Sequence, residues 1–134
     1  MTRSLTAGAV YFATVFALGF ALGTVRLLLL ESRVGLWAAT LIELPFMLAA
    51  SWLLCRWVVE RWQISPALGA RLHVGAVAFG LLMAAEILIG LTLLDREMPY
   101  QIEAMTSGPG ALGLAAQLLY ASFPVLQMRP EPKR

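Results

Sequence analysis

Long apolar stretches separated by short polar connections dominate the chain. Four of them, residues 6–30, 35–59, 71–94 and 110–128, reach roughly the 20 residues that a helix needs to cross a membrane. Backbone polar groups cannot stay unpaired in lipid, and the alternating pattern of a membrane barrel is absent, so each stretch is predicted to be helical. The pattern therefore predicts an all-α integral membrane protein, a four-helix transmembrane bundle made by a single domain over residues 1–134.

The connections between the stretches are short, and the longest has a helical pattern of its own. In this third connection, residues 95–109, Pro99 marks a helix start, and Gly108-Pro109-Gly110 breaks the chain before the last stretch. We expect a helix on the membrane surface at about residues 98–105. The connection serves either as a plain link or as a lid over the bundle.

Composition excludes the soluble alternatives. Hydrophobic residues make up 60% of the chain and charged residues 13%, with a mean hydropathy of +0.77. A soluble domain has about 45–50% apolar and about 25% charged residues, so this chain has too little polar surface for a water-facing globule. It is also far too hydrophobic to be disordered.

The basic residues are distributed unevenly over the two sides of the predicted bundle. The N-terminus, the second connection and the C-terminal tail hold Arg3, Arg56, Arg61, Arg71, Arg129, Lys133 and Arg134. The first and third connections hold Arg26, Arg33 and Arg96. The positive-inside rule then predicts a multi-pass protein of the cell inner membrane with both termini in the cytoplasm.

Two other interpretations of these charges are weaker. The basic residues form no patch, so no nucleic-acid partner is expected. A cleaved signal peptide is the minor alternative for the N-terminus, because the uncharged run over residues 4–25 exceeds the about 7–15 residues of a normal apolar core.

Each predicted helix carries one strongly polar residue at a similar depth. At 1.5 Å per residue, Glu43, Glu86 and Gln117 lie about 10–12 Å below the outer helix ends. Arg26 is shallower, about 6 Å deep, but its long side chain reaches the same level. An ionisable residue costs about 2.5–3.5 kcal/mol at the centre of a membrane helix and therefore needs a partner. We expect these four side chains to face one another as an intramembrane polar cluster.

Other residues on the same helix faces are predicted to support this cluster. Thr40, Ser51 and Tyr120 are the polar supporting residues. Small residues permit close approach of membrane helices, so five glycines on these faces are predicted packing sites. They are Gly19, Gly23, Gly75, Gly90 and Gly113.

The charges of the cluster suggest its chemistry. Two carboxylates and one guanidinium leave a surplus negative charge, so we expect Glu43 and Glu86 to share a proton while Arg26 binds one of them. A structural clamp, or an Arg26 side chain that extends outward to the head groups, is the simpler alternative. With one cysteine, one histidine and no catalytic motif, no metal, no cofactor and no enzymatic activity are expected.

Two functions fit these expectations. The first is an accessory, assembly or stress-related component of the membrane, whose polar layer holds the bundle or a partner helix. The alternative is a homo-oligomeric proton-coupled small-molecule transporter, or a lipid-head-group binder, that uses Glu43 and Glu86. Membrane lipids are the expected surroundings, and the expected association is a homodimer or a complex with a membrane protein partner.

Overall fold

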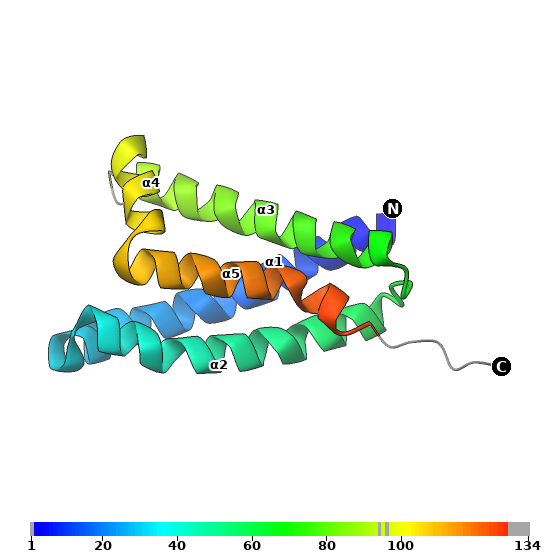
Figure 1. Cartoon of the computed structure of the whole chain (residues 1–134), viewed down its shortest axis with the longest axis horizontal. Coiled ribbons are helices and arrows are strands. Elements are labelled where there is room, and N and C mark those ends of the chain that lie inside the picture. The colour runs from blue at the N-terminus through cyan, green and yellow to red at the C-terminus, as the bar shows by residue number, and fades with distance from the viewer. Residues whose placement is uncertain (1, 94, 96, 129–134) are drawn as a thin grey trace.

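The regular secondary structure of the chain is helical wherever it is described. The computed structural model describes residues 2–93, 95 and 97–128 (Figure 1). Its elements are α1 (Thr2–Val25), the π-helical segment η1 (Arg26–Leu30), α2 (Glu31–Arg61), α3 (Leu68–Thr92), α4 (Met98–Thr106) and α5 (Gly108–Leu126). The described residues thus contain four long helices and one short one, in agreement with the predicted all-α class.

The first two long helices form a hairpin although their hydrogen bonding is nearly continuous. Inside α2, Gly35 departs from helical geometry with φ 84° and ψ 167°. A side chain would be strained at this φ, so glycine permits the reversal. Figure 1 shows α1 and α2 side by side and running in opposite directions. The predicted turn at residues 31–34 is helical, and the reversal follows one residue later.

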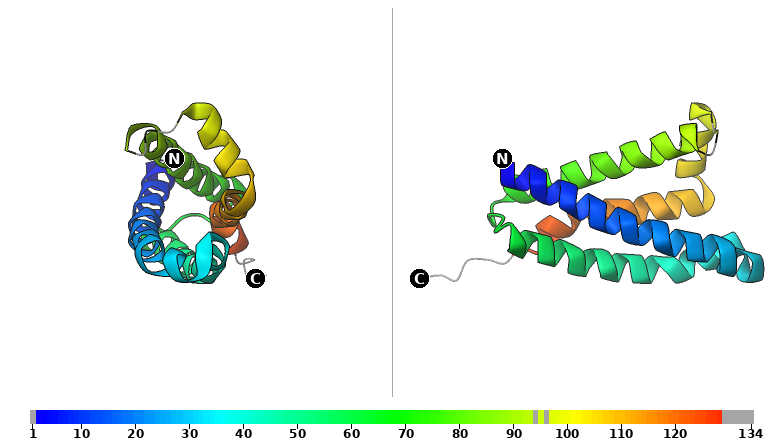
Figure 2. Two further views of the ribbon diagram at one scale, coloured as in Figure 1. Left: turned by 90° about the vertical axis from the view of Figure 1, so that its left-hand side faces the viewer. Right: turned by 180° about the vertical axis from the view of Figure 1, so that it is seen from behind.

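The four long helices form a ring in the order α1, α3, α5, α2, as the end-on view in Figure 2 shows. Each helix packs on two neighbours, so α2 and α3 lie on one diagonal of the ring and α1 and α5 on the other. The connection between α2 and α3 therefore runs across the end of the bundle. At the opposite end, α4 packs on α3 and α5 and lies across their axes (Figures 1 and 2). The helix predicted at about residues 98–105 is α4.

The tightest core lies toward the end where α1 begins and α2 ends. Its centre is Tyr11, whose hydroxyl donates a 2.7 Å hydrogen bond to the backbone carbonyl of Tyr120 on the diagonal helix. The two rings stack with centroids 4.3 Å apart. Buried residues of all four long helices surround this contact: Ala7, Val15, Cys55, Val58, Val74, Ala78 and Phe123.

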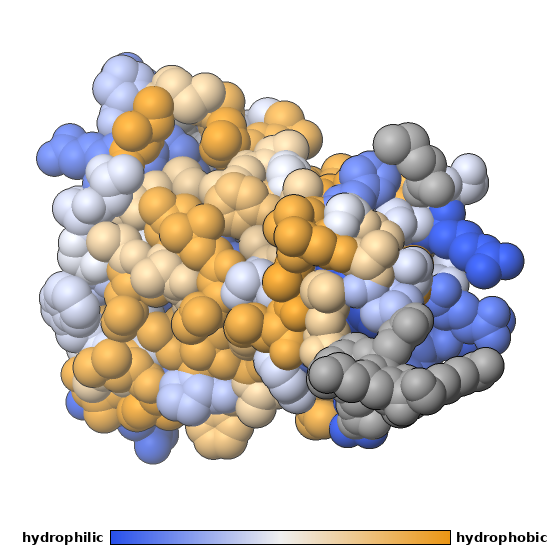
Figure 3. Space-filling view, turned by 45° about the vertical axis from the view of Figure 1, so that its right-hand side comes forward, coloured by the Kyte–Doolittle hydropathy of each residue, from blue (hydrophilic) through white to orange (hydrophobic). Residues whose placement is uncertain are grey.

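The outside of the bundle is strongly apolar. Three helical stretches are long and apolar enough to cross a membrane: Thr2–Arg61, which includes the hairpin reversal, Leu68–Thr92 and Gly108–Leu126. Figure 3 shows hydrophobic residues over the middle of the molecule and hydrophilic residues gathered toward its ends. These features suggest a multi-pass membrane protein.

Candidate intramembrane polar site

Arg26 joins the two arms of the first hairpin. Its Nε lies 2.5 Å from Oε2 of Glu43 in an ion pair between η1 and α2. Its Nη1 donates a 2.9 Å hydrogen bond to Oε1 of Glu31. The side chains of Arg26 and Glu43 are 27% and 17% exposed, so the pair is partly shielded from its surroundings. Arg26 therefore combines both sequence interpretations, because it holds Glu43 below and Glu31 near the hairpin end.

The π-helical geometry explains how Arg26 reaches Glu31. In a π-helix the N–H bonds to the carbonyl five residues earlier, and the N–H of Glu31 bonds to the carbonyl of Arg26 in this way. Residues five apart consequently lie above one another, which places the guanidinium beside the carboxylate of Glu31. Such segments are frequent at functional sites, and the apolar letters of residues 27–30 gave no sign of this one.

Glu86 and Gln117 form a second pair, between α3 and α5. Nε2 of Gln117 donates a hydrogen bond of 2.5 Å to Oε1 of Glu86. Both residues are half-buried. This side-chain contact links α3 to α5.

A third helix meets Glu86 through Gln101, a residue that the sequence analysis did not single out. Gln101 is buried at 5% exposure, and its Nε2 donates a long hydrogen bond of 3.4 Å to the backbone carbonyl of Glu86. Its Oε1 is buried and accepts no hydrogen bond from any described residue. The predicted packing residue Gly90 makes room for this side chain, since a Cβ at Gly90 would overlap it. A glutamine in a surface helix is expected to face water. The small residue at Gly90 was the one signal in the sequence that another side chain could pack there.

The four predicted site residues thus form two pairs on opposite sides of the ring. Among the described residues, no hydrogen bond or ion pair links Arg26 and Glu43 to Glu86 and Gln117. The ring order explains the separation, because Glu43 on α2 and Glu86 on α3 belong to diagonal helices. Each carboxyl has its own partner, and proton sharing between the two stays a prediction.

The predicted supporting residues lie apart from these pairs. The Thr40 hydroxyl donates to the carbonyl of Leu36 in its own helix. Ser51 and Tyr120 are both buried, and Tyr120 belongs to the core beside Tyr11. Ser51 and Tyr120 thus contribute to the packing of the bundle, and the support of the polar pairs by Thr40 stays a prediction.

The five predicted packing glycines differ in what surrounds them. A Cβ at Gly75 would overlap the backbone carbonyl of Ala121, so α3 and α5 approach most closely there. Gly19 faces Met47 on α2, whose Cε would lie 3.2 Å from an added Cβ.

Gly23 and Gly113 correct the prediction. An added Cβ would have no described atom within 4 Å at either position, so neither marks a close helix contact. Helix phase alone placed them on the inner face. Gly8, which the analysis did not choose, lies tightly against Val74 and Val77 of α3.

The described residues contain no group of three or more His, Cys, Asp or Glu side chains that could hold a metal ion. The two polar pairs make an ion pair and a hydrogen bond. The chain matches no family model, and no curated protein or solved structure is significantly similar to it.

Proposed function

We propose that the chain is an inner-membrane protein that crosses the bilayer four times and serves as an accessory or assembly component for a partner membrane protein. The polar pairs hold its own helices, and the apolar surface of its first hairpin binds the partner. Helix lengths support four crossings. Helices of 24, 25 and 19 residues for α1, α3 and α5 are about 36, 38 and 28 Å long, against a hydrocarbon core of about 30 Å.

The distribution of charge supports an orientation with both termini in the cytoplasm. Arg3, Arg56, Arg61 and Arg71 belong to the end where α1 begins, α2 ends and α3 begins. At the opposite end, the described part of the chain has Arg26 and Arg33. The excess of basic residues at the first end is the signature of a cytoplasmic side.

The length of the first hairpin is the observation that carries the proposed accessory role. Figure 1 shows that it reaches beyond α4 and the start of α5. The apolar arm over residues 6–30 has 25 residues and α5 has 19, a difference of six residues or about 9 Å. The overhanging part exposes large hydrophobic side chains: Leu27, Leu28, Leu29, Leu36 and Trp37.

An overhang of this kind favours a protein partner. Clusters of exposed hydrophobic residues mark contacts with other proteins or with the membrane. The core lies at the other end of the molecule, where α3 and α5 cover the hairpin, so the overhang is the part of the hairpin left for a partner. The Arg26–Glu43 ion pair links the two arms next to the overhang and holds them side by side for a partner.

Co-purification from native membranes tests this role. A tagged full-length chain is extracted in mild detergent, and the proteins bound to it are identified and quantified. Leu28→Gln weakens the overhang, and Leu72→Gln is the matched control, because Leu28 is 68% and Leu72 53% exposed but Leu72 lies at the start of α3. We expect one membrane protein at a fixed ratio to the chain, lost with Leu28→Gln and kept with Leu72→Gln.

The second proposal, a homo-oligomeric proton-coupled transporter or head-group binder, is favoured by the surroundings of Glu86. Its carboxylate has a neutral amide as its partner, and the buried Oε1 of Gln101 beside it has none among the described residues. Recovery of the chain as a homodimer without any other protein, with proton uptake that Glu86→Gln abolishes in vesicles, would replace the accessory role by this one.

A further inference from the structure

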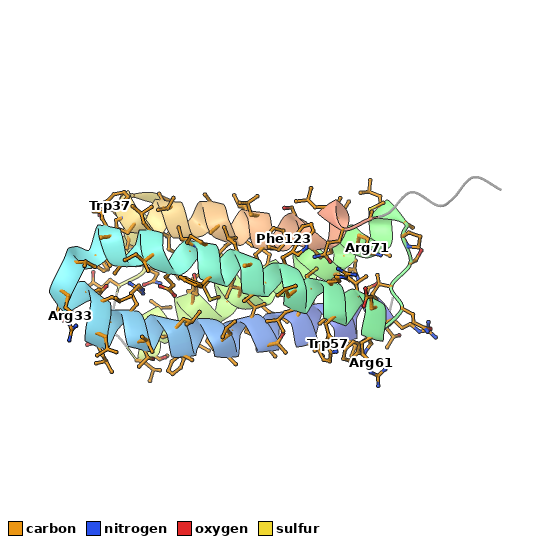
Figure 4. The ribbon with its side chains drawn as sticks, turned by 90° about the horizontal axis from the view of Figure 1, so that it is seen from below. Arg33, Trp37, Trp57, Arg61, Arg71 and Phe123 are labelled. Atoms are coloured by element: carbon orange, nitrogen blue, oxygen red, sulfur yellow. The ribbon has the colours of Figure 1, made fainter. Side chains whose placement is uncertain are left out.

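A pocket lies at the end of the bundle opposite to the polar pairs. It has a volume of about 490 Å³, within the range of about 300–1,000 Å³ of small-molecule sites. The end of α2, the connection to α3, the start of α3 and the end of α5 line it, chiefly through Trp52, Arg56, Arg71, Leu126 and Gln127. Figure 4 shows Arg71 close to this end of the ribbon, on the side of Phe123.

The pocket contains a buried positive charge. Arg71 is 7% exposed, and its guanidinium donates to three backbone carbonyls, those of Ser65, Pro124 and, at 3.5 Å, Ile64. These bonds use three of its five N–H groups. Carbonyls carry no net charge, and no carboxylate of a described residue lies within ion-pair distance of Arg71. The carbonyls offset part of the cost of burying this charge, and an anion would offset more of it by supplying the opposite charge.

The second cation of the pocket is weakly neutralised. Nε of Arg56 lies 3.1 Å from Oε1 of Glu60, but the two side chains are 55% and 67% exposed. Exposed pairs of this kind contribute little. Arg56 and Arg71 against Glu60 leave the lining with one net positive charge.

The rest of the lining fits a lipid better than a free anion. Trp52, Leu126 and Met128 add apolar surface beside the cations, and tryptophan is typical of the level where head groups meet acyl chains. Gln127 donates through Nε2 to the carbonyl of Trp52 at 2.8 Å, and its buried Oε1 has no partner among the described residues. That oxygen is an acceptor for a hydroxyl group.

We propose that this pocket binds the head group of an anionic phospholipid with a hydroxylated head, of the phosphatidylglycerol type, at the cytoplasmic surface. The phosphate lies between Arg56 and Arg71, because guanidinium groups match phosphate oxygens in geometry. The head-group hydroxyl reaches Gln127, and the acyl chains leave along Leu126. Basic pockets between membrane helices are known lipid sites. The accessory role proposed above rests on the other end of the molecule, so the two proposals fail independently.

Native mass spectrometry of the delipidated full-length chain tests the site. The protein is titrated with phosphatidylglycerol or phosphatidylcholine, and the dissociation constant of the first bound lipid is measured. Arg56→Gln removes a pocket cation, and Arg61→Gln is the matched control, since Arg61 lies at the end of the same helix but outside the lining. We expect Arg56→Gln to weaken phosphatidylglycerol binding about fivefold and Arg61→Gln to leave it within about twofold.

Arg71→Lys is a second test of the same site, because it keeps the positive charge but loses the planar set of guanidinium N–H donors. We expect it to lower the preference for phosphatidylglycerol over phosphatidylcholine; if it does not fold, the Arg56 and Arg61 variants still decide. The proposed site would be wrong if Arg56→Gln and Arg61→Gln weakened phosphatidylglycerol binding equally, or if the chain showed no preference for the anionic lipid. If millimolar glycerol phosphate or inorganic phosphate displaced the lipid, the ligand of the pocket would be a free anion and not a lipid.

Discussion

The hydrogen bond between Gln117 and Glu86 is expected to hold α3 to α5 by a measurable coupling energy. It joins the side chains of two half-buried residues on neighbouring helices. Gln117→Leu keeps the volume but leaves the half-buried Glu86 without its donor, which costs about 1–3 kcal/mol. Glu86→Leu leaves only a neutral amide unpaired, and the double variant leaves neither group.

The double variant should therefore lose less stability than the sum of the two single ones. Interhelical hydrogen bonds in membrane proteins average about 0.6 kcal/mol and reach about 1.7 kcal/mol. We expect this pair to fall within that range, at about 0.6–1.7 kcal/mol, because both partners are half-buried. The assay is reversible unfolding in mixed micelles, with the free energy of unfolding measured for the four proteins of the cycle.

Thr92→Val provides a matched control on the same helix. The Thr92 hydroxyl donates to the carbonyl of Leu88 within α3, so its loss should change the free energy of unfolding by less than about 0.5 kcal/mol. A coupling energy below about 0.3 kcal/mol, with each single variant no worse than the control, would refute the reasoning.

Three further predictions concern packing and charge. Gly75→Ala should cost about 1–3 kcal/mol, because its Cβ meets the α5 backbone, whereas Gly113→Ala has open space and should be neutral or stabilising; thermal unfolding of the two variants checks this contrast. Tyr11→Phe should cost about 1 kcal/mol by removing its hydrogen bond to the α5 carbonyl, with no effect expected on the ring stack, and near-ultraviolet circular dichroism separates the two contributions. Glu43→Gln should destabilise more than Glu31→Gln, because Glu43 lies deeper and closer to the guanidinium, and an equal loss in unfolding experiments would contradict that order.

The helical architecture and the short surface helix were accessible from the sequence because they depend on one-dimensional features. Apolar length specifies a candidate crossing, and proline and glycine mark the limits of α4. The reversal of the hairpin lies one residue later than the connection expected at residues 31–34. Those four residues are helical, and the positive φ that reverses the chain is at Gly35.

The division of the polar layer into two pairs was not accessible in the same way. Depth along each helix placed Arg26, Glu43, Glu86 and Gln117 at similar levels, but depth carries no information about which helices are neighbours. The ring order puts α2 and α3 on a diagonal. That order depends on side-chain packing in the core around Tyr11, to which all four long helices contribute.

The burial of Gln101 and Arg71 was not predicted from the sequence, for a related reason. Both lie near helix ends, where polar residues are expected to face water or head groups. Their burial arises from tertiary contacts with Gly90 and with the carbonyls of the connection between α2 and α3. The backbone of that connection is irregular, and no residue pattern announces where its carbonyls point.

The central claim is that the chain crosses the membrane four times with its polar pairs inside the bundle, and labelling of single cysteines in intact cells tests it most directly. In a Cys55→Ala background, cysteines are placed at Arg33, Gln63 and Glu103, one in each connection, and treated with a membrane-impermeant maleimide. We expect positions 33 and 103 to be labelled from outside and position 63 to be labelled only after the cells are opened. Labelling of positions 33 and 63 from the same side of the membrane would contradict it.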